Sequence, residues 1–182
     1  MDKETKEKLI KRVIKFYFVW SEDKEAKWLN DMSKKGWHLK KASIFNYTFE
    51  KGESADYVYQ FDFRMNSSKD EKEYLELFKG SGWEFINRMG GWYYFRKPYR
   101  EGGQNEIYSD KESLKQKYKK LLGFLLLTGI PLFYNFFTIF RSYGRSGFYR
   151  YFWPFNTFIL ILWLYAFIRI ILYVRKLTRE QE

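Results

Sequence analysis

The side chains that could carry out chemistry in this 182-residue chain are few and far apart. The chain has one histidine, His38, and no cysteine. Thiolate nucleophiles and cysteine metal sites are therefore excluded, as are metal sites built from several imidazoles. The carboxylates Asp56, Asp62 and Glu84 are scattered through predicted strands and turns, and their spacing matches no general acid–base pair. His38 is interpreted as an exposed structural residue on a strand.

Sequence motifs for nucleotide binding or nucleophilic serine chemistry are absent. The segment Gly80-Ser81-Gly82 resembles a fragment of a nucleophile elbow, but such an elbow joins a strand to a following helix. Here the segment follows a predicted helix and is interpreted as its end. No glycine-rich loop precedes a lysine, and no G-x-G-x-x-G occurs. We therefore expect that the protein is not an enzyme and uses no cofactor.

The net charge of +11 and the aromatic content of 23% superficially suit nucleic-acid binding. The aromatic residues, however, alternate as a protein core requires, and the lysines concentrate in residues 3–15 and 111–120. We expect no nucleic-acid partner. Residues 3–15 have two interpretations: an amphipathic helix on a lipid surface, with the apolar residues of 9–14 facing one way, or a solvated approach to the first strand.

Two long apolar runs dominate the C-terminal third. Residues 121–140 contain no charged residue, and residues 153–174 contain Arg169 alone. Each run matches the roughly 20 residues that cross a bilayer as a helix. Buried core helices are the alternative, but those normally keep a polar face, and these runs have none. We predict two transmembrane helices and no signal peptide, since the N-terminus has no apolar stretch.

The charges that flank these runs predict the topology. Eight lysines and arginines lie before the first run or after the second, against three in the loop of residues 141–152. The positive-inside rule then places both termini, including the tail of residues 175–182, in the cytoplasm of a multi-pass membrane protein. The basic residues that precede the first run are expected to face anionic lipid headgroups. This cluster consists of Lys115, Lys117, Lys119 and Lys120.

Four residues inside the apolar runs could affect how the helices pack or act. Pro131 removes an amide donor and is expected to kink the first helix. Asn135 and Asn156 need hydrogen-bond partners in lipid, either across the hairpin or between protomers of an oligomer. Arg169 is close enough to the inner end of its helix to reach the headgroups. Two spans form no pore alone, so a channel would require an oligomer.

The first hundred residues show an internal repeat. Trp28-Leu29 and Gly36-Trp37 recur as Tyr74-Leu75 and Gly82-Trp83, at a constant spacing of 46 residues. A fixed spacing of this kind is typical of a duplicated unit. Each copy reads as a strand, a helix that ends at glycine, and two short strands. The first strands are predicted from the alternating residues of 16–20 and 57–63.

The resulting prediction is an α+β fold in which a duplicated β-α-β-β unit forms a mainly antiparallel sheet with two helices on one face. This domain spans residues 1–104 and is followed by a basic juxtamembrane helix over 105–120. Residues 68–71 and 109–112 are predicted to cap the second and third helices. The expected core consists of Phe18, Leu29, Met32, Trp37, Tyr47, Phe61, Leu75, Phe78, Trp83 and Phe95. Exposed aromatics on the free sheet face would mark a partner surface, and the candidates are Tyr57, Tyr59 and Tyr94.

Four segments resemble a bacterial family, the domain of unknown function 2812. They are E-x-x-W-L-N-x-M-x-x-K-G-W-H-L at 25–39, Y-x-F-E-K-G-E at 47–53, Y-L-E-L-F-x-x-x-G-W-E-F at 74–85 and G-G-W-x-Y-F-R-K-P at 90–98. The resemblance covers roughly residues 13–110. It implies a Gram-positive membrane protein with C-terminal membrane helices, often encoded beside PadR-type transcription regulators. It supplies no catalytic residues.

Two functions follow as hypotheses. The first is a membrane-tethered cytoplasmic binding or sensing module that regulates through contact with a transcription regulator. The second is an accessory or immunity component of a membrane transport system, with a membrane transport subunit as its partner and the transmembrane hairpin as its working part.

Overall fold

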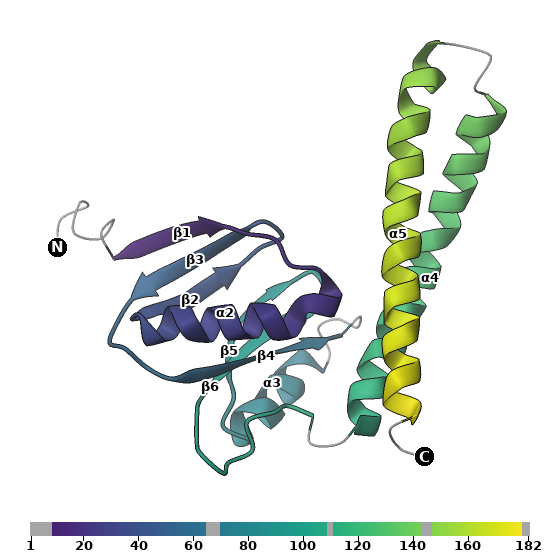
Figure 1. Cartoon of the computed structure of the whole chain (residues 1–182). Coiled ribbons are helices and arrows are strands. Elements are labelled where there is room, and N and C mark those ends of the chain that lie inside the picture. Colours follow the sequence, from purple (N-terminus) through teal and green to yellow (C-terminus); the bar gives the residue numbers. More distant parts are fainter. Residues whose placement is uncertain (1–8, 65–69, 109–110, 143–146, 180–182) are drawn as a thin grey trace. The chain divides into compact units, whose positions relative to one another are not determined.

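The structure is a computed structural model that describes residues 9–64, 70–108, 111–142 and 147–179. The chain divides into an α+β unit, residues 1–109, and a hairpin unit, residues 110–182 (Figure 1). In the α+β unit a 3-10 turn at Val19–Ser21 leads into the first helix. The other elements are β1 (Ile10–Ile14), α2 (Glu22–Lys34), β2 (Trp37–Ala42), β3 (Asn46–Lys51), β4 (Tyr57–Phe63), α3 (Glu71–Gly80), β5 (Glu84–Met89) and β6 (Trp92–Pro98).

The strands of the α+β unit pair antiparallel throughout. Within the described residues they form two three-stranded sheets, sheet A in the order β1-β3-β2 and sheet B in the order β4-β6-β5. The predicted α+β class is confirmed. The strands were expected to form one sheet, but its backbone hydrogen bonding is interrupted where β2 and β5 lie side by side. There the side chain of Asn87 donates to the Ala42 carbonyl and accepts from the Ala42 amide, both at 2.9 Å.

The spacing of 46 residues reappears in the backbone. Gly36 and Gly82 both have positive φ, +74° and +83°, at the ends of α2 and α3. Glycine suits these positions because a left-handed conformation costs it little. The ladders are irregular between Leu39 and Lys41 and between Phe85 and Asn87, again 46 residues apart. Positive-φ glycines and ladder irregularities thus occur at this same spacing in sheets A and B.

The two helices lie on opposite faces of sheet B, which corrects the expectation that they share one face. Consecutive residues of a strand point to opposite faces. The ring of Phe95 stacks on Phe78 of α3 at 4.4 Å, whereas the hydroxyl of its neighbour Tyr94 donates to Glu25 of α2. Helix α2 thus packs against both sheets, and α3 covers the other side of sheet B (Figure 1).

The start of the chain also differs from the prediction. The first strand is β1 at Ile10–Ile14, and Phe16 and Phe18 lie beyond it. The amphipathic-helix interpretation of residues 9–14 is therefore wrong. Val13 points into the core opposite Tyr47 of β3. The position of the first strand is therefore determined by the burial of Val13 and by pairing with β3, and not by the alternating aromatic residues that follow. Phe18, expected in the core, is 44% exposed. The other expected core residues are buried or half-buried.

The hairpin unit consists of α4 (Lys111–Arg141) and α5 (Gly147–Arg179), which pack along one another. In the described part of the chain, these are the two helices long and apolar enough to cross a membrane. Only 6% and 11% of their most apolar stretches are buried, whereas the core helix of a soluble protein would be mostly covered. Helix α4 continues through Pro131. The predicted caps at residues 68 and 109 lie outside the described residues. Residues 143–146 of the predicted outer loop also lie outside them.

Candidate functional site

A pocket opens at the junction of sheet A and sheet B, on strands β2, β3, β4, β5 and β6. Its volume is about 400 Å³, and it contains the chain's one histidine. The pocket lies where β2 and β5 adjoin without a continuous backbone ladder, since the Asn87 side chain bonds Ala42 in its place. Its polar lining residues are His38, Lys40, Glu50, Lys51, Glu84 and Arg96.

His38 is held in one orientation in the pocket wall. Its Nε2 lies 2.7 Å from the carbonyl oxygen of Glu53, and because a carbonyl only accepts, Nε2 carries the hydrogen. The ring meets Tyr57 edge-on at 5.4 Å. A Cβ at Gly52 would lie 2.8 Å from the imidazole Cδ2, so glycine is needed for this approach. Nδ1 is buried and has no hydrogen-bond partner among the described residues. The sequence predicted an exposed structural residue here, whereas His38 is half-buried.

Arg96 of β6 and Glu84 of β5 form a bidentate ion pair. Nε and Nη2 of Arg96 each donate to one Glu84 oxygen at 2.7 Å. Burial tends to lower the pKa of Arg96, but the hydrogen bonds and charge of Glu84 outweigh it and raise that pKa. The guanidinium also lies 4.9 Å from the centre of the Tyr57 ring. Glu84 thereby fixes the arginine as a rigid, planar donor group at the pocket edge.

The lysines of the pocket are also engaged. Lys40 donates to Glu50 at 3.1 Å. Lys51 donates to the Lys35 carbonyl at 3.0 Å and lies over the Trp37 ring. Besides His38, the lining carries three cations and two carboxylates. This combination of fixed charges and aromatic surface suits recognition of a polar or anionic group. In the described residues, no three His, Asp or Glu side chains gather closely enough to hold a metal ion.

The predicted partner-surface tyrosines lie in different places. Tyr57 is half-buried and forms part of the pocket wall. Tyr59 and Tyr94 are only 1% and 3% exposed, so the expectation that they face solvent is wrong. They lie beneath α2, which covers the face of sheet B that was expected to be free. The Tyr59 hydroxyl bonds Ser33 of α2 at 2.7 Å.

Glu25 is a buried carboxylate that was not among the predicted functional residues. Oε1 of Glu25 accepts hydrogen bonds from Tyr47 at 2.7 Å and from Tyr94 at 3.0 Å. Burial raises the pKa of Glu25, although both hydroxyls act to lower it. Glu25 is one turn before Leu29 on the core-facing stripe of α2, and that spacing is the signal that could have located it.

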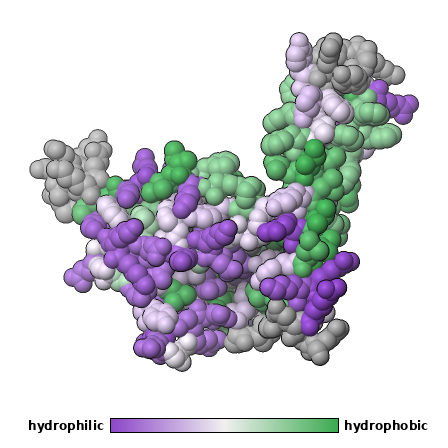
Figure 2. All heavy atoms as spheres, viewed as in Figure 1, coloured by the Kyte–Doolittle hydropathy of each residue, from purple (hydrophilic) through white to green (hydrophobic). Residues whose placement is uncertain are grey.

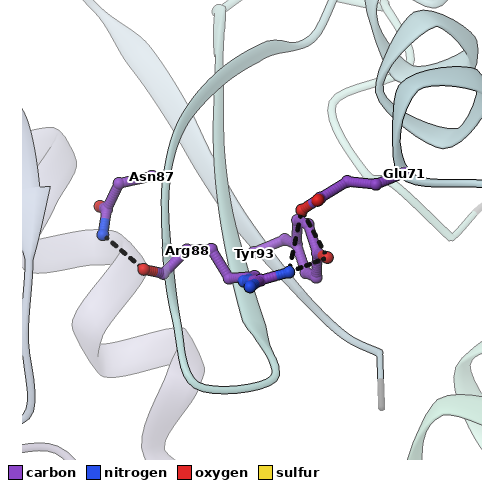
Figure 3. Close-up of polar contacts among 4 residues, drawn as sticks. All are labelled: Glu71, Asn87, Arg88 and Tyr93. Carbon is purple, nitrogen blue, oxygen red and sulfur yellow. Dashed lines mark hydrogen bonds and ion pairs between the residues drawn. The ribbon is translucent and has the colours of Figure 1, made fainter. Parts of the chain in front are cut away.

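Two further carboxylates bond tyrosine hydroxyls on the α3 side. Asp62 accepts from Tyr74 at 2.7 Å and also from Tyr108. Figure 3 shows the second: Tyr93 donates to Oε1 of Glu71 at 2.9 Å, while Arg88 donates to both groups. Burial raises the pKa of Tyr74 and Tyr108, as does the adjacent Asp62 carboxylate. These hydroxyls therefore remain protonated donors, and the contacts are structural.

The polar residues of the hairpin unit lie as follows. Nδ2 of Asn156 donates to Oδ1 of Asn135 at 3.1 Å, so the hairpin itself satisfies part of both amides. Arg169 is exposed, with its guanidinium 6.0 Å from the Tyr165 ring. Among the basic cluster, Lys119 and Lys120 are exposed, and Lys115 pairs with Glu112 at 3.3 Å. Lys117 is 4% exposed and lies near the Tyr118 ring, contrary to its predicted lipid-facing position.

Comparison with known proteins identifies the family. Residues 21–130 match the family described as protein of unknown function (DUF2812). The chain belongs to this family. The DUF2812 match begins just before α2 and ends inside α4, so the matched region includes the connection between the α+β unit and the first apolar helix. No curated protein and no solved structure matches the chain.

Proposed function

We propose that the protein is a membrane-anchored binding module in which the α+β unit, in the cytoplasm, contacts a partner protein through the pocket between sheets A and B. The observation that carries this proposal is the combination of two apolar helices, largely uncovered in the described chain, with a pocket of fixed charges and aromatic rings. The pocket offers donors and acceptors to a partner, and its charged groups are engaged in ion pairs and hydrogen bonds rather than poised as nucleophiles. We propose binding, not catalysis, as its use.

The proposed partner is a PadR-type transcription regulator, which the module would hold at the membrane or release. The alternative is a transport accessory or immunity protein that acts through α4 and α5. The bond between Asn135 and Asn156 favours an anchoring role for the hairpin, because it joins the two helices within one chain.

Affinity purification from native membranes tests the partner. The full chain is compared with Lys40→Glu, which reverses a charge at the pocket, and with Lys72→Glu, a matched reversal at an exposed site on α3. We expect a cytoplasmic regulator to co-purify with the wild type and with Lys72→Glu. It should be absent from the Lys40→Glu sample. Transport subunits that persist with Lys40→Glu but disappear with Asn135→Ala would contradict the proposal and favour the alternative.

Topology is tested separately, and the absence of native cysteine makes this simple. Single cysteines are introduced at Ser142, in the predicted outer loop, and at Tyr99, which is 50% exposed in the α+β unit. A membrane-impermeant maleimide applied to intact cells should label Ser142→Cys and leave Tyr99→Cys unlabelled until the cells are opened. Labelling of Tyr99→Cys in intact cells would refute a cytoplasmic α+β unit.

A further inference from the structure

The α+β unit exposes an apolar patch that neither the core nor the pocket uses. Its members, named here the aromatic patch, lie at the end of β1 and in the turn between β2 and β3. Figure 2 shows apolar surface along this border of the unit. Ile14 is 85% exposed and Phe45 is 60% exposed. The aromatic patch consists of Ile14, Phe16, Phe18, Ile44 and Phe45.

These side chains form a contiguous surface rather than isolated exposures. The Phe16 ring lies 4.8 Å from that of Phe18 and 5.3 Å from that of Phe45. The amide of Lys15 donates to the Phe45 carbonyl at 3.1 Å, which holds the two segments together. Tyr17, between the two phenylalanines, turns inward onto Trp28 and Tyr47. The backbone thus directs one set of rings into the core and the other outward. A contiguous exposed apolar surface of this kind marks an interaction site.

The charge around the aromatic patch selects the partner. The patch residues and the strands that flank them, residues 9–20 and 37–48, contain five lysines and arginines and no aspartate or glutamate. These cations are Lys11, Arg12, Lys15, Lys40 and Lys41. Lys40 is paired with Glu50 of β3. A second copy docked on this surface would bring like charges together, which costs free energy. Anionic lipid headgroups would instead complement the cations while the rings enter the interface.

We propose that the aromatic patch is a second membrane contact, through which the α+β unit lies on the surface of an anionic bilayer. This inference rests on the proposed anchoring of the chain by α4 and α5. Because the hairpin keeps lipid within reach, a weak intrinsic affinity suffices for the patch to be bound. The contact would bring the pocket close to the membrane, and its loss would release the unit.

The test uses the full chain in vesicles of phosphatidylcholine and phosphatidylglycerol that contain a nitroxide-labelled lipid. An environment-sensitive fluorophore is attached to single cysteines in the otherwise cysteine-free chain. Ile14→Cys and Phe45→Cys report on the patch. Leu77→Cys is the matched control, since Leu77 is 68% exposed on α3, and Leu127→Cys, 61% exposed on α4, reports on the hairpin. Circular dichroism of each labelled protein checks that it is folded.

We expect the nitroxide lipid to reduce the fluorescence at Ile14→Cys, Phe45→Cys and Leu127→Cys, and to leave Leu77→Cys unchanged. Reduction at Leu127→Cys alone would overturn the patch contact and leave the anchoring intact. No reduction at Leu127→Cys would overturn the anchoring and the inference that rests on it. A blue shift at Phe45→Cys that is independent of the nitroxide-labelled lipid and grows with protein concentration would identify a second copy of the chain as the occupant. That result would also overturn the proposal.

Discussion

Carboxylates bonded by tyrosine hydroxyls recur among the described residues of the α+β unit. Glu25 receives two such bonds between α2 and the sheets, Asp62 receives two beside α3, and Glu71 receives one. A phenol is a useful partner for a buried carboxylate because it provides a donor and also a large apolar surface. In a chain with 16 tyrosines, this pairing allows acidic residues to enter an aromatic core.

Glu25 makes the stability of the α+β unit depend on pH. Burial raises its pKa above the ordinary value of 4.5, so the folded state binds this proton more tightly than the unfolded state. The corresponding stabilisation is complete below pH 4.5 and is lost as pH rises through the folded pKa. We expect Glu25→Gln to remove this loss, so that its unfolding free energy relative to the wild type improves as pH rises.

Chemical unfolding of the full chain in detergent, followed by tryptophan fluorescence across pH, measures this difference. Glu50→Gln, at an exposed carboxylate of β3, is the matched control for the loss of one carboxylate. A constant offset between Glu25→Gln and the wild type at every pH would show that Glu25 does not titrate in this way.

The sequence could predict which residues are apolar and strand-like but not which face each one meets. Tyr59 and Tyr94 were expected to face solvent because the alternation along a strand does not say what covers its second face. The covering element is α2, which precedes all strands of sheet B in the chain. The pocket was missed for the same reason, since His38, Tyr57 and Arg96 meet only where two sheets of separate halves join.

At the scale of elements, Asn87 replaces a backbone ladder with a side chain. Its amide group has the same donor and acceptor arrangement as a peptide, which is why it can bond both the N–H and the C=O of Ala42. The corresponding position in the first half, 46 residues earlier, is Lys41. A lysine has no acceptor, so only one side of the junction can supply this bridge.

Asn87→Ala should lower the unfolding free energy by about 1–3 kcal/mol, because two part-buried hydrogen bonds are lost and Ala42 keeps unpaired polar groups. Denaturant unfolding of the full chain measures the change. Asn46→Ala, at an exposed asparagine of β3, serves as the control and should be close to neutral. An equal effect of both substitutions would mean that the Asn87 bridge contributes nothing specific.

Alanine substitutions at Gly36 and Gly82, at the ends of α2 and α3, distinguish the cost of backbone strain from the cost of steric crowding. Both have positive φ, so alanine at either should cost about 1 kcal/mol. At Gly36 the added Cβ would also lie 2.6 Å from the Gly52 carbonyl oxygen, whereas at Gly82 its nearest neighbour is the Lys97 side chain at 3.7 Å. Gly36→Ala should therefore lower the thermal unfolding midpoint more than Gly82→Ala. The reverse order would show that crowding at Gly36 is relieved elsewhere.

Helix ends and the α+β class could be predicted because glycine positions and apolar periodicity are local signals. The first strand was misplaced because residues 16–20 alternate as a strand does, yet the side chains of Phe16 and Phe18 point outward beyond β1. The side of sheet B on which each helix lies was also missed, since it depends on how two similar halves pack.

At the scale of the whole molecule, the chain combines a folded α+β unit with a hairpin whose helices pack through small and aromatic residues. Gly129 is buried against Trp163, whose ring also contacts Phe133 and Phe167. A Cβ at Gly129 would lie 2.4 Å from this ring, whereas a Cβ at Gly123 meets nothing within 4 Å. These two glycines of α4 form a matched pair for testing the hairpin.

Gly129→Ala should destabilise the hairpin by about 1–3 kcal/mol through overpacking, and Gly123→Ala should not. Titration with a denaturing detergent, followed by energy transfer between labels on α4 and α5, measures the separation of the helices. If both variants separate at the wild-type detergent fraction, the Trp163 ring moves freely and the packing at Gly129 is not tight.

The packing of α2 against both sheets has a consequence for how the protein is made. Synthesis proceeds from the N-terminus, so the first half leaves the ribosome while Leu29 and Met32 still lack the strands of sheet B that complete their surroundings. The apolar face of the nascent first half therefore stays uncovered until β6, which ends at Pro98, has been synthesised. That residue precedes Lys111, where the first apolar helix begins. The order of elements along the chain therefore lets the α+β unit close before the hairpin needs insertion.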